Sequence, residues 1–141
     1  MFQISTGKVE DIEEIKILYQ KCGYGGGVKS EDCVFIARIN NQLAGAVRLC
    51  SEMNVLVLRG MQILPKFQNQ GIGTELLKSC DRYLARKSCY CLPWQHLHSF
   101  YERVGFKAIS PEQLPAFLNQ RFQHYIASKM NVISMYRPGG K

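Results

Sequence analysis

The chain has 141 residues, 46% of them hydrophobic and 21% charged, and it carries a formal net charge of +7. This composition is typical of an ordinary globular protein, and the length predicts a single domain, residues 1–141, with a sizeable core. No apolar stretch approaches the roughly 20 residues that span a bilayer, and the N-terminus lacks the basic and apolar regions of a secretory signal. We therefore expect a cytoplasmic protein with no membrane partner.

The six cysteines are spaced unlike a disulfide framework or a zinc site, because no C-x-x-C occurs and Cys89 and Cys91 are the one close pair. We expect no metal site, and thiols that are reduced and act as small hydrophobic groups. A reactive Cys89 or Cys91 is the alternative that this pattern leaves open.

The positive charge favours an anionic ligand, such as a nucleotide cofactor with several phosphates. Nucleic acid is a weaker interpretation because the basic residues are dispersed. Lys78, Arg82, Arg86 and Lys87, for example, lie along one predicted helix and are typical of a solvated helix face.

In chain order, the first half predicts a strand, an amphipathic helix and an antiparallel meander. The expected bounds are 2–4 for the strand, 9–21 for the helix and 33–39, 43–50 and 55–64 for the meander, whose last strand is predicted to be buried. Asn40-Asn41-Gln42 is a hairpin signal between the first two meander strands. Residues 23–27, Gly-Tyr-Gly-Gly-Gly, are too glycine-rich for a regular element and predict a connector.

The second half alternates helices and short strands. We expect helices over 71–87, 95–104 and 111–128, and strands at 89–92, from Phe106 onward and at 132–136. The order β-α-β-β-β-α-β-α-β-α-β predicts an α/β fold, with a mixed, largely antiparallel sheet flanked by helices.

The turn Gln68-Asn69-Gln70-Gly71-Ile72-Gly73 lies between the strand at 55–64 and the helix at 71–87. The first turn of a helix has unpaired N–H groups at the positive end of the helix dipole, which suits a phosphate or pyrophosphate. A dinucleotide fingerprint would need a glycine where Leu76 stands, and a Walker loop would need Gly-Lys-Ser/Thr where Gly73-Thr74-Glu75 stands. Neither of these phosphate motifs fits the turn.

The spacing Gln68-x-x-Gly71-x-Gly73 resembles the pyrophosphate-binding signature of the GNAT superfamily of N-acetyltransferases. About thirty residues further on, Phe100-Tyr101-Glu102-Arg103-Val104-Gly105-Phe106 is similar to the second signature of that family, and Ile63-Leu64-Pro65 resembles the end of its fourth strand. The resemblance implies a GNAT-like fold, in which the fourth and fifth strands splay apart and the gap holds the pantetheine arm of acetyl-coenzyme A (acetyl-CoA).

The resemblance also implies a role for each matching residue. The cofactor-binding residues would be Ile63, Leu64, Gln68, Asn69, Gln70, Gly71, Ile72, Gly73 and Thr74. The amides of residues 69–74 would bind the pyrophosphate, Gln68 would tether the turn, and the Ile63 N–H would polarise the thioester carbonyl. Tyr101 would donate a proton to the leaving thiolate, the alternative being a tyrosine that simply packs in its helix.

Two departures from the family pattern concern the chemistry. The strand at 55–64 contains no carboxylate, so the general base is open among Glu52, His96 and His98, or a water chain, or an amine that arrives neutral. Trp94 stands where many relatives have an asparagine that contacts the pantetheine.

We therefore predict an N-acetyltransferase that transfers an acetyl group from acetyl-CoA to a primary amine by direct attack in a ternary complex. The alternative is a non-catalytic coenzyme A (CoA) sensor or interaction module on the same fold. The acceptor is open among a small-molecule amine, a peptide N-terminus and a protein lysine, as is a homodimer.

Overall fold

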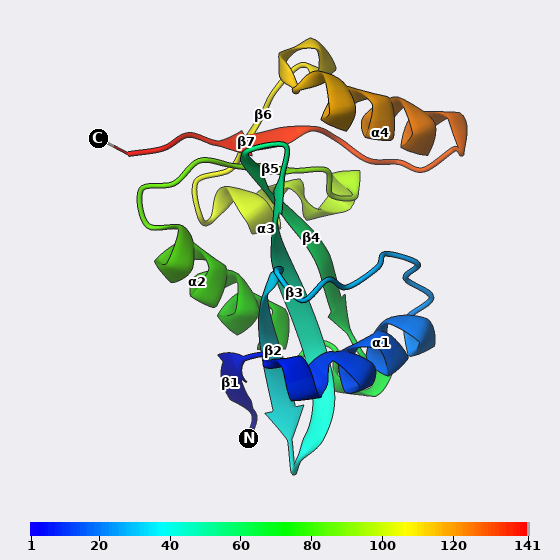
Figure 1. Ribbon diagram of the computed structural model, residues 1–141, viewed down its shortest axis with the longest axis vertical. Helices are drawn as coiled ribbons and strands as arrows, with labels where there is room; N and C mark the ends of the chain where they lie inside the picture. The colour runs from blue at the N-terminus through cyan, green and yellow to red at the C-terminus, as the bar shows by residue number, and fades with distance from the viewer. Residues whose placement is uncertain (141) are drawn as a thin grey trace. The chain divides into compact units, whose positions relative to one another are not determined.

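The computed structural model describes residues 1–140 and divides into two compact units, the first of residues Met1–Tyr83 and the second from Leu84 onward. Figure 1 labels their helices and strands. Within residues 1–140, none of the helices combines the length and the apolar character that a membrane crossing requires. That the whole chain is one domain stays a prediction.

The first unit is an antiparallel meander with a helix before it and a helix after it. Its elements are β1 (Gln3–Thr6), a 3-10 turn (Val9–Asp11), α1 (Ile12–Lys21), β2 (Cys33–Ile39), β3 (Gln42–Glu52), β4 (Val55–Ile63), a second 3-10 turn (Pro65–Phe67) and α2 (Ile72–Leu84). Each strand pairs antiparallel with the next one along the chain. Asn40 and Asn41 form the predicted hairpin turn, with φ of 50° and 67°, which asparagine tolerates better than most residues.

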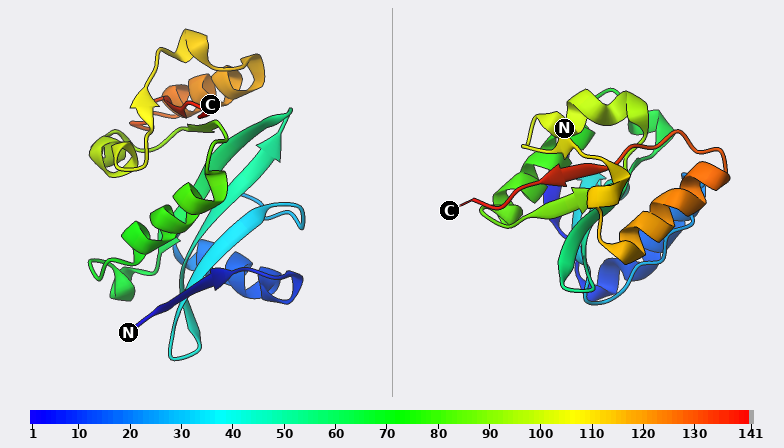
Figure 2. Two further views of the ribbon diagram at one scale, coloured as in Figure 1. Left: turned by 90° about the vertical axis from the view of Figure 1, so that its left-hand side faces the viewer. Right: turned by 90° about the horizontal axis from the view of Figure 1, so that it is seen from above.

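Helices α1 and α2 cover opposite faces of this sheet (Figures 1 and 2). Adjacent residues of β2 show the alternation, because Ile36 belongs to the core cluster that contains Ile15 and Leu18 of α1, whereas Phe35 packs edge-to-face on Tyr83 of α2. The prediction that residues 55–64 form a buried strand was partly wrong. Most of β4 is half-buried, and its buried residues are Val57 and Leu58.

A β-bulge interrupts β4 near its end. Ala46 pairs with Gln62 and Arg48 pairs with Arg59, so Gly60 and Met61 together lie opposite Val47. Gly60 has a φ of 67°, the left-handed conformation in which such a bulge favours glycine. The bulge sets the register of the last residues of β4.

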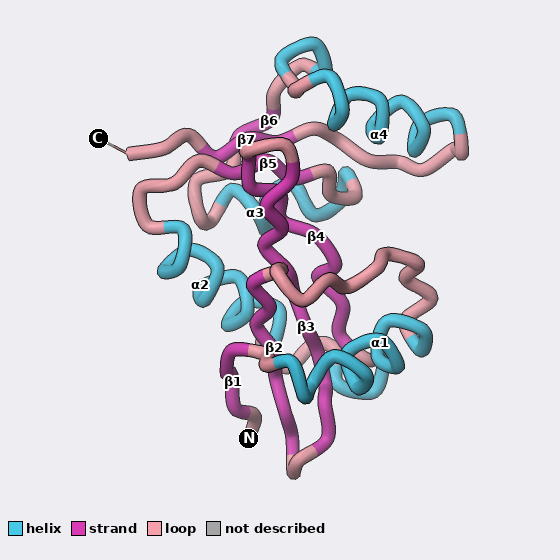
Figure 3. Tube along the Cα trace, in the orientation of Figure 1, coloured by secondary structure: helices cyan, strands magenta, loops and turns pink. Residues whose placement is uncertain are grey.

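The second unit contains short strands and helices. Its elements are β5 (Cys89–Cys91), a 3-10 turn (Gln95–Leu97), α3 (His98–Glu102), β6 (Lys107–Ala108), a 3-10 turn (Pro111–Gln113), α4 (Ala116–Ala127) and β7 (Met135–Arg137). Strand β7 pairs antiparallel with both β5 and β6, and the Tyr90 and Tyr136 rings pack across the β5–β7 pair. Figure 3 shows how much of this unit is loop.

The predicted element order is confirmed, but three bounds were wrong in this unit. The helix expected at 95–104 is a 3-10 turn followed by the short α3, and the final strand begins at Met135, because Val132 makes only an isolated bridge to Trp94. The helix expected at 111–128 is broken before Ala116. Pro115 causes this break, since a proline disfavours helical geometry in the residue before it and is tolerated at a helix start.

Candidate functional site

The turn before α2 is open to solvent. Residues 68–71 are exposed, and Asn69 and Gly71 adopt left-handed backbone conformations with φ of 65° and 85°. A Cβ atom added to Gly71 would meet nothing within 4 Å. A side chain at position 71 would therefore project into the space in front of the turn, in a backbone conformation that favours glycine.

The amides of this turn are available to a ligand. The Gln68 N–H donates to the Pro65 carbonyl at 3.3 Å, and the Glu75 N–H makes the first helical bond, to the Gly71 carbonyl at 3.1 Å. The amides of residues 69–74 lie between Gln68 and Glu75 and donate to no protein group within the described residues 1–140. They lie at the N-terminus of the 13-residue helix α2, where the helix dipole adds positive potential, so the turn can bind an anion such as a diphosphate.

Gln68 ties the turn to the end of β4, because its Nε2 donates to the Ile63 carbonyl at 3.1 Å. The Leu64 N–H donates to the Ala44 carbonyl at 2.8 Å. Hydrogen-bonded and non-hydrogen-bonded pairs alternate along an antiparallel ladder, so the next pair, Gly45 with Ile63, is non-hydrogen-bonded. The N–H and C=O groups of Ile63 therefore point away from β3.

Tyr101 lies in α3 of the second unit and is 3% exposed. Its ring packs edge-to-face on Phe100 and Phe106, with centroids 5.0 Å and 5.9 Å away. The same contacts are expected for a tyrosine that only packs in its helix and for a phenol held in a fixed direction to donate a proton. The role of Tyr101 as a proton donor therefore stays a prediction.

The residues considered as general bases lie in different surroundings. Glu52 forms an ion pair with Arg59 at 3.7 Å across β3 and β4, the His98 Nε2 lies 3.6 Å from a Glu102 carboxylate oxygen, and His96 is exposed. This geometry favours none of Glu52, His96 and His98 as the base. Trp94 is 42% exposed and immediately precedes a 3-10 turn.

The cysteines form no disulfide among residues 1–140, and within the same residues no group of three or more potential metal-binding side chains occurs. Cys89 and Cys91 are buried, with exposures of 0% and 3%. Burial raises the pKa of the Cys50 thiol to about 12.

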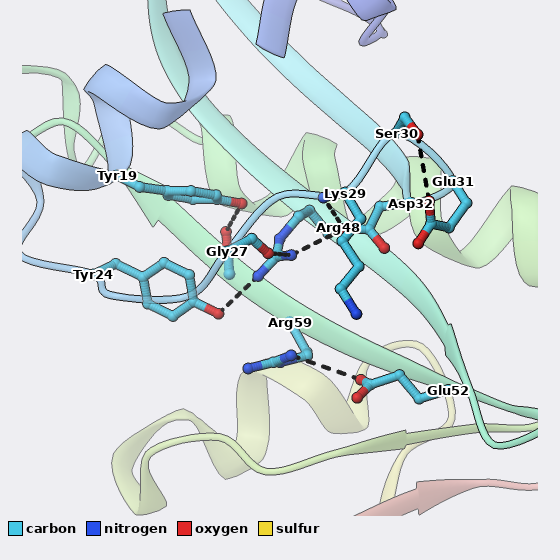
Figure 4. A network of polar contacts seen from close by, with 11 residues as sticks. Tyr19, Tyr24, Gly27, Lys29, Ser30, Glu31, Asp32, Arg48, Glu52 and Arg59 are labelled. Carbon is cyan, nitrogen blue, oxygen red and sulfur yellow. Dashed lines mark hydrogen bonds and ion pairs between the residues drawn. The ribbon is translucent and has the colours of Figure 1, made fainter. Parts of the chain in front are cut away.

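A buried arginine network, which the sequence reasoning missed, lies in the first unit (Figure 4). Arg48 of β3 is 1% exposed and forms an ion pair with Asp32 at 3.0 Å. Its Nη2 donates to the Tyr24 hydroxyl at 3.0 Å, its Nη1 donates to the Gly27 carbonyl, and its guanidinium lies over the Tyr19 ring. A single arginine within the apolar strand expected at 43–50 is the signal that could have indicated it.

The electrostatics of this network keep Arg48 charged. Burial by itself would lower the pKa of the guanidinium, but the neighbouring Tyr19, Cys50, Tyr24 and Asp32 groups outweigh burial and raise the pKa above its ordinary value. Arg48 is therefore a permanent cation inside the first unit.

A cavity of about 210 Å³ lies beside this network, between the start of α1 and residues 28–34. Its lining residues are Gly7, Lys8, Val9, Ile12, Ile15, Val28, Lys29, Ser30, Asp32 and Val34. None of the predicted site residues lines it, so it is separate from the turn before α2.

Solved structures of acetyltransferases resemble this chain. The ribosomal-protein-S18-alanine N-acetyltransferase from Escherichia coli is 16% identical with a TM-score of 0.73, over 100% of this chain and 96% of that one. The PaiA N-acetyltransferase from Thermoplasma acidophilum, solved in complex with CoA, is 16% identical with a TM-score of 0.66, over 98% of this chain and 99% of that one.

N-acetylglutamate synthase from Neisseria gonorrhoeae, complexed with CoA and N-acetyl-glutamate, is 19% identical with a TM-score of 0.73 over 100% of this chain. This chain spans about a third of the length of that synthase, 36%. At these identities the likeness shows the fold, and it confirms the predicted α/β, GNAT-like architecture.

A search of curated proteins finds no match to the sequence. The acetyltransferase (GNAT) domain model matches residues 30–108, which is more than half of the chain and includes the whole turn before α2. This chain therefore belongs to the GNAT family of acetyltransferases.

Proposed function

We propose that this protein is an N-acetyltransferase that transfers the acetyl group of acetyl-CoA to a primary amine by direct attack in a ternary complex. The observation that carries the proposal is the series of amides at residues 69–74, which donate to no protein group in the described chain and lie at the start of α2. Family membership and the CoA complexes of two structural neighbours support the same ligand.

The turn fits a diphosphate by its donor chemistry. The amides of residues 69–74 would bind the phosphate oxygens, and Gly71 would leave room for them because it has no side chain in the open space before the turn. The main chain of Leu64 would border the pantetheine arm. Acetyl-CoA, when bound, supplies an activated thioester.

Two groups of the chain would act on the transfer itself. The Ile63 N–H, which points away from β3, would donate to the thioester carbonyl and stabilise the negative charge that develops on its oxygen. The Tyr101 hydroxyl would donate a proton to the departing sulfur. Glu52, His96 and His98 remain the candidates for accepting the proton of the amine.

The acceptor class is proposed from chemistry and from the neighbours. One neighbour is named for an alanine of a ribosomal protein and another for N-acetylglutamate, so both protein and small-molecule amines are candidate acceptors for this chain. A homodimer, a cytoplasmic location and the absence of nucleic-acid and membrane partners stay predictions from the sequence.

Calorimetry and a turnover assay test the proposal. We expect acetyl-CoA to bind with a Kd of about 1 μM or below, free CoA to compete, and thiol to be released when a panel of amines is added. Binding without thioester consumption across the panel would favour the non-catalytic CoA sensor instead. Absence of both binding heat and competition would refute both interpretations.

The role of Tyr101 has its own test. Tyr101→Phe should lower turnover by about 100-fold and leave the Kd for acetyl-CoA within about twofold of the wild-type value. Equal losses in turnover and affinity would make Tyr101 a packing residue.

A further inference from the structure

The ion pair between Arg48 and Asp32 is almost completely buried, with side-chain exposures of 1% and 5%. Such a pair is a weak source of stability, because removing both charges from water costs about as much as their attraction returns. Stability alone therefore does not explain why Arg48 and Asp32 are paired in the interior.

The donors of Arg48 are used unevenly. Nη1 and Nη2 donate to Gly27, Asp32 and Tyr24, which all belong to the segment between α1 and β2. The Arg48 Nε is buried and has no hydrogen-bond partner among residues 1–140. A Cβ atom on Gly60 would lie 3.2 Å from this Nε, so the guanidinium packs directly against the bulge of β4.

Tyr19 contacts the same glycine. Its hydroxyl donates to the Gly60 carbonyl at 2.9 Å, and a Cβ atom on Gly60 would lie 2.5 Å from that hydroxyl oxygen. The Tyr19 ring is 2% exposed and lies under the Arg48 guanidinium, 5.5 Å from its carbon. Arg48 and Tyr19 thus fill the space where a Cβ of residue 60 would lie, and the Tyr19 hydrogen bond fixes the carbonyl of Gly60 in its left-handed conformation.

The bulge decides the direction of the Ile63 N–H. Ile63 follows Gly60 by three residues and lies opposite Gly45 in a non-hydrogen-bonded pair. Shifting the register of a strand by one residue turns every later group to the opposite side. Without the extra residue of the bulge, the Ile63 N–H would point toward β3 and would be used in the ladder.

We propose that Tyr19 is a positioning residue, held by the Arg48–Asp32 ion pair, which fixes the Gly60 bulge and through it the direction of the Ile63 N–H. The inference rests on the proposed function, in which that N–H polarises the thioester carbonyl. It also couples the segment between α1 and β2 to the bulge, because that segment supplies every hydrogen-bond acceptor identified for Arg48.

The test uses Tyr19→Phe, which removes the hydroxyl and keeps the ring. Two readouts are needed: the amide resonance of Ile63 and the hydrogen exchange of the Leu64 amide in the ligand-free protein, and kcat and KM for acetyl-CoA. We expect the Ile63 resonance to move, the Leu64 amide, which donates to the Ala44 carbonyl, to exchange at least about tenfold faster, and kcat to fall about tenfold while KM stays within about twofold.

Tyr83→Phe is the matched control, because Tyr83 lies on α2 of the same unit and is 42% exposed. It should leave the Ile63 resonance and kcat unchanged. An unchanged Ile63 resonance with wild-type kcat in Tyr19→Phe would overturn the proposal.

Arg48→Lys is the second variant, for the case in which Tyr19→Phe does not fold. A lysine keeps the charge beside Asp32 but lacks the planar guanidinium that packs against both Tyr19 and Gly60, so the Ile63 resonance should move in the same direction. The resonance arm needs no turnover. If the wild-type protein proves inactive, the proposed function fails while the positioning of Ile63 is still decided by the resonance.

Discussion

Two glycine-rich segments of the first unit differ in how their polar groups are used. Residues 23–32 supply a carbonyl, a hydroxyl and a carboxylate to the buried Arg48. The turn at 68–74 instead presents a run of amides that donate to no protein group in the described chain. Glycine content therefore does not distinguish a turn with unused amides from a connector whose polar groups are hydrogen-bonded. The difference lies in which backbone and side-chain groups the fold already uses.

The largest expected effect is on residues 23–32, the segment that is hydrogen-bonded to Arg48. Asp32→Asn leaves the Arg48 guanidinium buried without its anion, so the free energy of unfolding should fall by about 3 kcal/mol, measured by urea denaturation at neutral pH. Adding Arg48→Met to this variant should restore much of the loss. Glu13→Gln, which alters a surface pair whose glutamate is 84% exposed, should change stability by less than about 0.5 kcal/mol. A loss below about 1 kcal/mol in Asp32→Asn would mean that the segment is not held by this pair.

The next effect is on the turn at residues 68–74, the proposed diphosphate site. Gly71→Val places a β-branched side chain at a φ of 85°, in the open space before the turn, so acetyl-CoA should bind about 100-fold more weakly by calorimetry. Gly25→Val is the matched change in residues 23–32, because a Cβ there also meets nothing within 4 Å and Gly25 has no positive φ. It should leave the affinity for acetyl-CoA unchanged. Equal affinity in the two variants would remove the distinction between the segments.

The turn could be predicted from the sequence because its signals are local. An aliphatic strand, two glycines and an apolar helical stripe follow one another within residues 55–87. The Arg48 network could not be predicted in the same way. Tyr19, Asp32 and Arg48 come from a helix, a loop and a strand, and no spacing in the sequence relates them.

The direction of the Ile63 N–H was also beyond the sequence, although the residue itself was predicted from the family resemblance. That direction depends on a single extra residue at Gly60, and the register of a strand pair cannot be read from an apolar run. Gly60 within the strand was the available sign, because an isolated glycine in a strand pattern suggests a bulge.

A third effect is on the surroundings of Arg48 at alkaline pH. Burial raises the pKa of Cys50 to about 12 from its ordinary value of 9.0, so the unfolded thiol ionises first. The stability that the buried, neutral Cys50 thiol contributes is complete below the unfolded pKa. As pH rises toward the folded pKa, the free energy of unfolding falls by up to about 1.4 kcal/mol per pH unit. The wild-type protein should lose stability faster than Cys50→Ala between about pH 9 and about pH 10.5 in urea denaturation. Parallel curves would contradict this prediction.

The smallest expected effect concerns the hydrogen bond that ties the turn at residues 68–74 to the end of β4. Gln68→Ala removes the exposed hydrogen bond to the Ile63 carbonyl, so the affinity for acetyl-CoA should fall about fivefold, measured in the same titration. Gln20→Ala, an exposed glutamine of α1, serves as the control and should bind as the wild type does. Wild-type affinity in Gln68→Ala would show that the turn keeps its shape without the tether.

The most direct measurement follows the backbone amides of both segments while CoA is added to the ¹⁵N-labelled protein. The amide resonances of residues 69–74 should move on binding, whereas those of Tyr24, Gly25 and Gly27 should stay in place. If CoA binds while the resonances of residues 69–74 remain unchanged, the turn is not the diphosphate site and the account of the cofactor is wrong.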